Sequence, residues 1–263
     1  SDSGFAVKDH YKIDNRLGNW SDIAKFSKKY DVMADIVINH SSARGLWFKN
    51  FLKDKKPGKD YFLKVDSKFD VSKVIRPRDH QLLKKIDIFK KPEYLWRTFS
   101  PDQLDLNFKN PAVLLRFIKI IINLINHGVT IFRLDAIAYL WKKNGTKCIN
   151  LKETHEIIKL LRMICGLLNV ESVIVTETNL PEKENISYFG NSDEANWIYN
   201  FSLPPLLIYS FLFEDSSYLN NWNKKLPQTK KGNSYLNFIA SHDGIGMRPV
   251  SYTHLTLPTI FRV

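Results

Sequence analysis

Apolar residues follow two different periods along this chain. In some segments they recur every three or four residues, as on one face of a helix, and in others they form short runs typical of buried strands. The predicted strands are residues 32–39, 130–135, 173–177 and 235–240, and the predicted helices are residues 22–30, 111–128 and 153–168. Because strands alternate with helices, the pattern predicts parallel βαβ units and an α/β fold class.

The helix before residues 130–135 has the clearest end signals. Asn110 is suited to cap its first turn, Pro111 occupies the first helical position, and Gly128 closes it. Apolar residues recur between these ends at helical spacing, at positions 113, 114, 117, 118, 121, 122 and 125. The strand of residues 130–135 is expected to follow at once.

Residues 130–135 (TIFRLD) place two charged side chains on a strand. Period 2 puts Ile131, Arg133 and Asp135 on one face. An Arg and an Asp at the end of an otherwise apolar strand are costly to bury. The strand therefore predicts either an ion pair between the two side chains or a pocket that uses them, and it leaves both alternatives open.

Polar residues stand at or just past the ends of four predicted strands. They are His40, Asp135, Glu177 and Asp243. Barrel enzymes place catalytic groups at this end of their strands. Carboxylates on one rim suit glycoside chemistry, in which a nucleophilic carboxylate and a carboxylic acid lie about 5–5.5 Å apart in retaining enzymes. A metal site is the alternative, but Arg133 supplies positive charge where a cation would sit, which favours an ionised nucleophile.

The composition is that of a globular protein, because 44% of the 263 residues are hydrophobic and 13% are aromatic. The net charge of +12 raises nucleic acid or an anionic substrate as a partner, but the lysines are scattered over helices and loops, which favours a solvated surface. Cys148 and Cys165 form no spacing motif and predict neither disulfides nor a metal cluster. This cysteine usage fits a reducing compartment, and a cytoplasmic location is expected. No apolar run has bilayer length, and the first residues show no signal-peptide pattern.

Several ordered segments of the sequence resemble the signature regions of the α-amylase clan of retaining α-glucosidases and transglucosidases. They are DIVINH (35–40), FRLDAIAYLW (132–141), VTETN (175–179) and ASHDGIG (240–246). Further stretches, including GFAVKDHYKID, RPR (76–78) and FSPDQLDLN, resemble the sucrose phosphorylase branch with the related glucosylglycerate phosphorylase group. The resemblance implies a partial (β/α)8 TIM barrel with a small inserted subdomain after the third barrel strand.

The resemblance assigns residues 1–40 and 106–249 to the barrel. Residues 41–105, where aromatic residues stand between charged and Pro-containing turns, are the predicted insertion. In the family, further elements precede the match to GFAV and follow the match to HDGIG, so we expect a fragment that is inactive alone. Because VSYTHLTLPT resembles a reading frame of a sequencing-library adapter, residues 250–263 are predicted to be a non-native tail. The apolar alternation of LTLPTI leaves a genuine strand as the alternative.

Carried over by position, the resemblance gives roles to individual residues. It makes Asp135 the nucleophile that forms a β-glucosyl enzyme, Glu177 the general acid/base, and Asp243 the carboxylate that stabilises the transition state. The residues implied to bind the substrate are Asp9, His40, Gln103, Arg133 and His242. Arg78 matches a position linked to phosphate binding. The alternatives are purely structural roles. His40 would then be a core histidine with its hydrogen bonds made inside the protein, and Phe5 and Trp96 would be core residues and not stacking surfaces.

The function implied by the resemblance is phosphorolysis by double displacement. The expected partners are small molecules, namely sucrose or a related α-glucoside such as glucosylglycerate, and inorganic phosphate, with α-glucose 1-phosphate as product. No metal, organic cofactor, nucleic acid or membrane is called for. An α-glucosidase or transglucosidase, with water or a sugar as acceptor, is the first alternative. A non-catalytic barrel is the second, although such a protein would usually have lost a catalytic carboxylate, and here all are present.

Overall fold

The computed structural model describes residues 4–88, 91–168 and 171–245, so the predicted tail at residues 250–263 lies outside the described residues. The chain divides into two compact units, Ser1–Ser172 and Val173–Val263. None of the helices in the described part of the chain is long and apolar enough to cross a bilayer.

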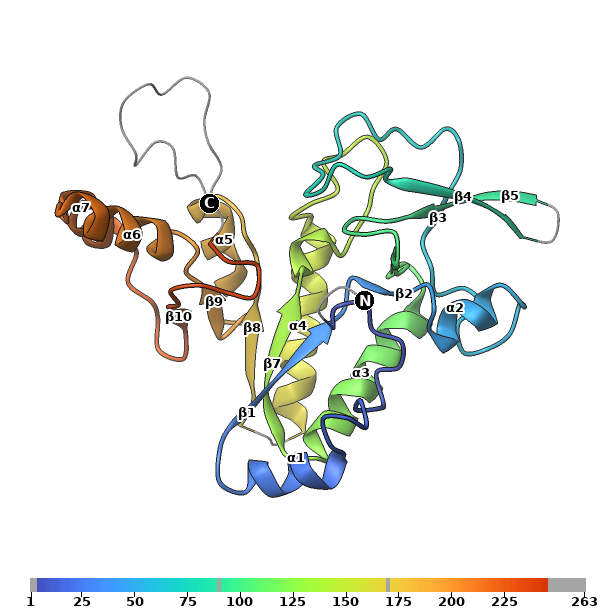
Figure 1. Cartoon of the computed structure of the whole chain (residues 1–263), viewed down its shortest axis with the longest axis horizontal. Helices are drawn as coiled ribbons and strands as arrows, with labels where there is room; N and C mark the ends of the chain where they lie inside the picture. The colour runs from blue at the N-terminus through green and yellow to red at the C-terminus, as the bar shows by residue number, and fades with distance from the viewer. Residues whose placement is uncertain (1–3, 89–90, 169–170, 246–263) are drawn as a thin grey trace. The chain divides into compact units, whose positions relative to one another are not determined.

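The first unit is built on two parallel strands, β1 (Val32–Val37) and β7 (Val129–Asp135). Their register places Asp35 beside Arg133 and Val37 beside Asp135. The helices of this part are α1 (Trp20–Ser27), α3 (Pro111–Ile125) and α4 (Lys152–Leu167), with a short 3-10 helix, η1 (Ile137–Tyr139), after β7. Helix α3 packs against β7 (Figure 1), which confirms the predicted helix–strand unit.

Helix α1 begins earlier than the periodicity indicated. The Asn19 side chain accepts a hydrogen bond from the Ser21 backbone N–H at 2.8 Å, and Asp22 accepts one from the Asn19 N–H at 3.0 Å. This capping box satisfies two backbone donors that would otherwise lack partners, so the helix starts at Trp20. The prediction placed the start at residue 22 because it followed the apolar positions and missed the cap.

The segment between β1 and α3 carries antiparallel structure. Strand β2 (His40–Ser42) pairs with β6 (Gln103–Asp105), and a separate sheet has the order β3 (Lys64–Val65), β5 (Lys91–Trp96) and β4 (Leu83–Ile88). A short helix, α2 (Leu46–Phe51), lies between β2 and β3. These elements belong to the same compact unit as β1 and β7, so the predicted boundary of an insertion at residues 41–105 stays a prediction.

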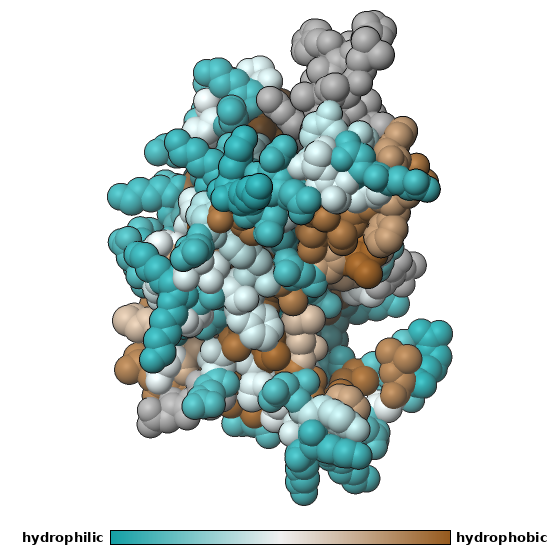
Figure 2. All heavy atoms as spheres, turned by 90° about the vertical axis from the view of Figure 1, so that its left-hand side faces the viewer, coloured by the Kyte–Doolittle hydropathy of each residue, from teal (hydrophilic) through white to brown (hydrophobic). Residues whose placement is uncertain are grey.

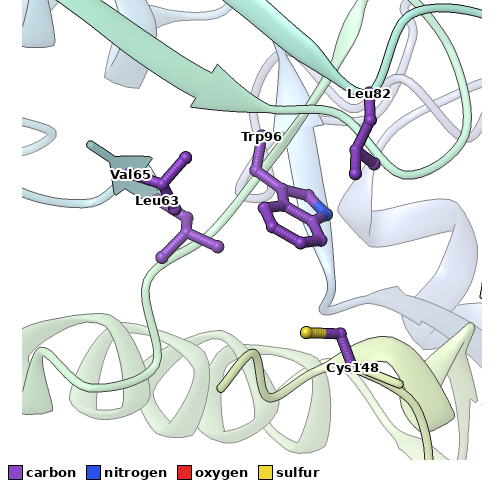
Figure 3. Packing of buried hydrophobic residues seen from close by; sticks show 5 residues of the cluster. All are labelled: Leu63, Val65, Leu82, Trp96 and Cys148. Atoms are coloured by element: carbon purple, nitrogen blue, oxygen red, sulfur yellow. The ribbon is translucent and has the colours of Figure 1, made fainter. Parts of the chain in front are cut away.

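A buried cluster joins this sheet to the loop after η1 (Figure 3). It consists of Leu63, Val65, Leu82, Trp96 and Cys148. The Trp96 indole is 1% exposed and donates its N–H to Thr98 Oγ1 at 3.2 Å. Trp96 is therefore a core residue and not an exposed stacking surface, and Cys148, a buried free thiol in the same cluster, is structural.

Replacing Trp96 by Ala is expected to lower the free energy of unfolding by about 3–5 kcal/mol, because the side chain leaves a cavity that its neighbours fill only in part. Urea unfolding of the two proteins measures the difference. Phe211→Ala is the matched control, since this aromatic side chain is 82% exposed, and it should change stability by less than about 0.5 kcal/mol. An equal effect of the two substitutions would contradict the core assignment.

The second unit carries another set of parallel strands. Strand β9 (Trp197–Tyr199) pairs with both β8 (Val173–Thr176) and β10 (Ser234–Leu236). Its helices are α5 (Glu182–Ile186), η2 (Ser187–Phe189), α6 (Leu203–Phe213) and α7 (Ser217–Lys225). Helix α6 is apolar on all sides and ends in exposed Phe211, Leu212 and Phe213. Apolar surface is visible beside hydrophilic side chains in Figure 2.

Strand β10 is shorter than predicted. The apolar run at residues 235–240 indicated a longer strand, but strand pairing stops at Leu236. Its neighbour β9 ends at Tyr199, which lies opposite Leu236, so the residues that follow have no partner strand there. The chain instead enters a turn in which Ser241 and Gly244 exchange backbone hydrogen bonds. The turn carries His242 and Asp243.

Candidate active site

Asp135 and Arg133 lie on the same face of β7, at its C-terminal end. Both are buried, and Arg133 Nη1 donates a hydrogen bond to Asp135 Oδ1 at 3.1 Å. Arg133 also pairs with Asp35, which stands opposite it on β1. The ion pair that the sequence allowed is therefore present, and it includes a second carboxylate that the sequence reasoning did not consider. Arg133 thus forms ion pairs with a carboxylate on each of the two neighbouring strands.

The chain turns sharply straight after Asp135. Ala136 has a φ of 51°, in the left-handed region that a residue with a Cβ rarely adopts, and it leads directly into η1. Such a conformation costs of order 1 kcal/mol and persists only where the surrounding structure imposes it. Left-handed backbone at a strand end that presents a buried carboxylate is the geometry expected of a functional site.

The backbone carbonyl of Phe5 connects several of the predicted site residues. It receives hydrogen bonds from His40 Nε2 at 3.1 Å and from Gln103 Nε2 at 3.2 Å. The Phe5 ring lies beside Arg133, with the guanidinium carbon 5.7 Å from the ring centroid. His40, Gln103, Arg133 and Asp135 are thus brought together through Phe5, whose role the sequence did not settle. His40 is 1% exposed, so it borders the site from within the core.

Behind His40 lies a buried polar network that the sequence reasoning missed. The Lys142 ammonium donates to Asn39 Oδ1 at 2.8 Å and pairs with Asp105, and neither charged side chain is more than 2% exposed. Asp105 also accepts from the Thr98 N–H at 2.8 Å and from Thr98 Oγ1 at 2.6 Å. Burial lowers the pKa of Lys142, and the Asp105 carboxylate opposes that shift. Nothing in the sequence indicated that Lys142, which follows an apolar run, would be buried.

Asp9 is not part of this group of contacts. Its carboxylate accepts a hydrogen bond from the Tyr11 N–H at 2.9 Å and lies 3.9 Å from the Lys12 ammonium, both within its own loop. The next residue, His10, stacks on Trp47 with ring centroids 4.8 Å apart, and burial lowers its pKa to about 3, so it is neutral near pH 7. The contacts described for Asp9 anchor a loop, and its substrate role stays a prediction.

Arg78 lies exposed on a loop that is anchored at its C-terminal end. Arg76 donates to the backbone carbonyl of His80, and His80 Nε2 donates to the carbonyl of Arg97 at 3.2 Å. The Arg97 guanidinium, largely buried, donates to the Gln81 carbonyl at 2.8 Å. The loop therefore presents the Arg78 side chain to solvent from an anchored backbone.

The other predicted catalytic groups belong to the second unit. Glu177 directly follows the buried end of β8 and is half-buried. His242 and Asp243 occupy the turn after β10, with His242 Nε2 3.6 Å from Asp243 Oδ2, and Asp243 is exposed. Because the carboxylates are divided between two units, their convergence in one pocket stays a prediction. Within the described ranges, no group of three or more His, Cys, Asp or Glu side chains could hold a metal ion.

Parallel strands joined by helices, with polar side chains at their C-terminal ends, define part of a (β/α)8 barrel of the kind that carries carbohydrate enzymes. The chain belongs to the α-amylase catalytic domain family, whose sequence model matches residues 1–253.

Among its relatives, the glucosylglycerate phosphorylase of Spirochaeta thermophila is 46% identical over 95% of this chain, which spans 42% of that protein. The sucrose phosphorylase of Agrobacterium vitis is 28% identical over 94% of this chain and 51% of its own length. The crystal structure of sucrose 6F-phosphate phosphorylase from Thermoanaerobacter thermosaccharolyticum superposes with a TM-score of 0.82 at 25% identity, covering 96% of this chain and 52% of that one. The chain thus spans about half the length, or less, of these relatives.

Proposed function

We propose that the full-length protein that carries this chain is a retaining α-glucosyl phosphorylase, with glucosylglycerate as its first candidate substrate. The observation that carries the proposal is the buried Arg133–Asp135 pair at the end of a barrel strand, in a chain that resembles glucosylglycerate phosphorylases along nearly its whole length. Sucrose is the second candidate donor, because the more distant relatives include sucrose phosphorylases. The cytoplasm is the proposed location, since both cysteines are free.

The proposed reaction has two displacements. Asp135 attacks the anomeric carbon while Glu177 protonates the leaving glycerate oxygen, and the bond to that oxygen breaks as the bond to Asp135 forms. Phosphate then attacks the same carbon, Glu177 takes its proton, and the bond to Asp135 breaks to release α-glucose 1-phosphate. Asp243 stabilises the oxocarbenium-like transition states. Arg133 supports the first step because it holds one oxygen of the Asp135 carboxylate with a charge-assisted hydrogen bond and so orients the nucleophile.

The remaining roles belong to binding. Asp9, His40, Gln103, Arg133 and His242 are proposed to surround the glucosyl ring, His40 and Gln103 acting through the Phe5 carbonyl that both of them hold. Arg78 is proposed to bind phosphate, because a guanidinium pairs with phosphate through two hydrogen bonds and the loop that carries it is anchored.

The test is an assay of the full-length gene product with glucosylglycerate, with and without inorganic phosphate. We expect glucose 1-phosphate and glycerate to form in equal amounts, and only when phosphate is present. Release of free glucose at the same rate with and without phosphate would identify a hydrolase, and formation of a new glucoside without phosphate a transglucosidase. Inactivity on every α-glucoside tried, with or without phosphate, would indicate a non-catalytic barrel.

Replacing Arg78 by Ala is expected to raise KM for phosphate about tenfold to a hundredfold, since hydrogen bonds to charged groups contribute about 1.5–3 kcal/mol. KM for the glucoside should stay the same, because the first displacement does not involve phosphate. Lys85→Ala, which removes an exposed cation from β4, is the matched control and should change neither constant. An unchanged KM for phosphate in the Arg78 variant would remove this assignment.

A further inference from the structure

The Lys142–Asp105 pair lies in the interior of the first unit and takes no part in the proposed chemistry. The two side chains are 2% and 0% exposed. Removing two charges from water is costly, and apolar residues of similar volume often serve stability as well or better. A charged pair at such a place suggests that the direction of its hydrogen bonds matters more than its contribution to stability.

The direction of those bonds fixes the amide of Asn39. An ammonium only donates and a carboxylate only accepts. Lys142 therefore requires the oxygen of the Asn39 amide on its side, and Asp105, whose Oδ2 lies 3.0 Å from Asn39 Nδ2, requires the nitrogen on the other side. Both charged groups therefore select the same orientation of the Asn39 amide. Rotated by 180°, the amide would place its NH2 group against Lys142 and its oxygen against Asp105.

The Asn39 amide in turn selects the protonation state of His40. Asn39 Nδ2, a donor, lies 3.3 Å from His40 Nδ1, which must then be the unprotonated ring nitrogen. His40 Nε2 lies 3.1 Å from the Phe5 carbonyl, which can only accept. His40 is thereby held as the neutral ring with its proton on Nε2.

The same bonds reach the face of β7 that carries Asp135. His40 and Gln103 both donate to the Phe5 carbonyl and so fix the backbone at Phe5. The Phe5 ring lies beside the Arg133 guanidinium. Arg133 donates to Asp135 at 3.1 Å. A continuous series of contacts within one compact unit therefore joins Lys142 to the proposed nucleophile.

We propose that Lys142 is a positioning residue for the glucosyl site: its ammonium fixes the Asn39 amide, which holds His40 as the Nε2–H tautomer and so keeps Phe5 in place beside Arg133 and Asp135. The assignment of Asp135 as the nucleophile rests on the proposed function, whereas the direction of each hydrogen bond between Lys142 and Phe5 rests on the structure alone. The Nδ1–H tautomer of His40 would bring two donors together at Asn39 and two acceptors together at the Phe5 carbonyl, and so release Phe5.

The first test needs no activity. Imidazole nitrogen NMR of the full-length protein labelled at histidine, with the His40→Gln variant to assign the signal, reports which ring nitrogen carries the proton. We expect His40 as a single neutral Nε2–H tautomer near pH 7. A protonated Nδ1, or an imidazolium, would overturn the proposal, and this result can be read in the native protein whether or not any variant folds.

The second test removes both charges together. Lys142→Met combined with Asp105→Asn leaves no buried charge unpaired, so the fold should persist while Asn39 loses the donor that orients it. We expect a mixture of His40 tautomers and a fall in kcat/KM for the glucoside of about tenfold to a hundredfold, the scale on which small misplacements of reacting groups act. The single variant Lys142→Arg keeps the charge and the hydrogen-bond donors. It should therefore show less mixing of His40 tautomers and a smaller fall in kcat/KM than the double variant.

Lys143→Met is the matched control, because the neighbouring Lys143 forms an exposed pair with Glu153 at 4.0 Å and should change neither readout. A folded double variant with an unaltered His40 tautomer would overturn the proposal. If His40 shows the expected tautomers in wild type and double variant but the protein performs no phosphorolysis, the proposed function fails. The directions assigned to the hydrogen bonds from Lys142 to His40 then still hold. If phosphorolysis is present and the tautomer is wrong, only the role of Lys142 is lost.

Discussion

Asp135→Asn is expected to abolish turnover of the full-length protein, lowering kcat about ten-thousandfold or more, because an amide cannot form the glucosyl ester on which both displacements depend. The loss should be chemical and not structural. Arg133 donates to Asp135 Oδ1, and an asparagine oxygen can accept the same bond. Steady-state rates and urea unfolding of the same preparation therefore separate the two effects, and the midpoint of unfolding should move little.

Asp35 supplies the matched control for this experiment. It pairs with the same Arg133 from β1, in register with it, but its side chain is 46% exposed. Asp35→Asn weakens the ion pair and leaves the proposed nucleophile in place, so we expect a loss of less than about tenfold, the usual scale of a partly exposed pair. Equal damage from the two substitutions would mean that the carboxylates serve Arg133 and that neither is the nucleophile.

Glu177→Gln is expected to slow the reaction with glucosylglycerate about a hundredfold to ten-thousandfold, the contribution typical of a general acid. It should spare α-glucosyl fluoride, whose leaving group needs no proton. The position of Glu177 fits this role, because it directly follows the buried end of β8, at the end of the strand where barrel enzymes place catalytic groups. The measurement compares kcat/KM for the two donors in wild type and variant, because kcat/KM for a donor reports the first displacement alone and excludes the second, in which Glu177 accepts a proton.

The control for this substitution lies at the other end of the same strand. Glu171 precedes β8 and is exposed, so Glu171→Gln should leave both donors unaffected. If Glu177→Gln slows glucosylglycerate and the fluoride by the same factor, proton donation cannot be its contribution, and a binding or structural role would replace it.

The elements predicted best from the sequence have strong local signals. Helix α3 was predicted because Asn110, Pro111 and the apolar spacing agree, and the Asn110 side chain does accept a bond from the Ala112 N–H at 3.0 Å. Strand β9 was missed because a strand of its length carries too little periodicity to be recognised. The excess length predicted for β10 has the related cause that a partner strand, not the apolar run, decides where pairing stops.

The candidate site likewise contains residues that the sequence could predict and contacts that it could not. Its strand-end residues could be found from the sequence, because a polar residue after an apolar run is a local feature, and the family resemblance gave them roles. The contacts that hold them could not be found. Lys142 and Asn39 are 103 positions apart, and Gln103 is 98 positions from Phe5. Such pairs depend on how the strands assemble and leave no mark in a local pattern.

Proton and phosphorus NMR of the first product formed from glucosylglycerate and phosphate tests the central claim most directly. Two displacements at one carbon retain its configuration, so the account predicts that α-glucose 1-phosphate is present from the earliest time point. β-Glucose 1-phosphate would indicate a single displacement without a glucosyl ester on Asp135. Free glucose in place of either phosphate ester would contradict phosphorolysis itself.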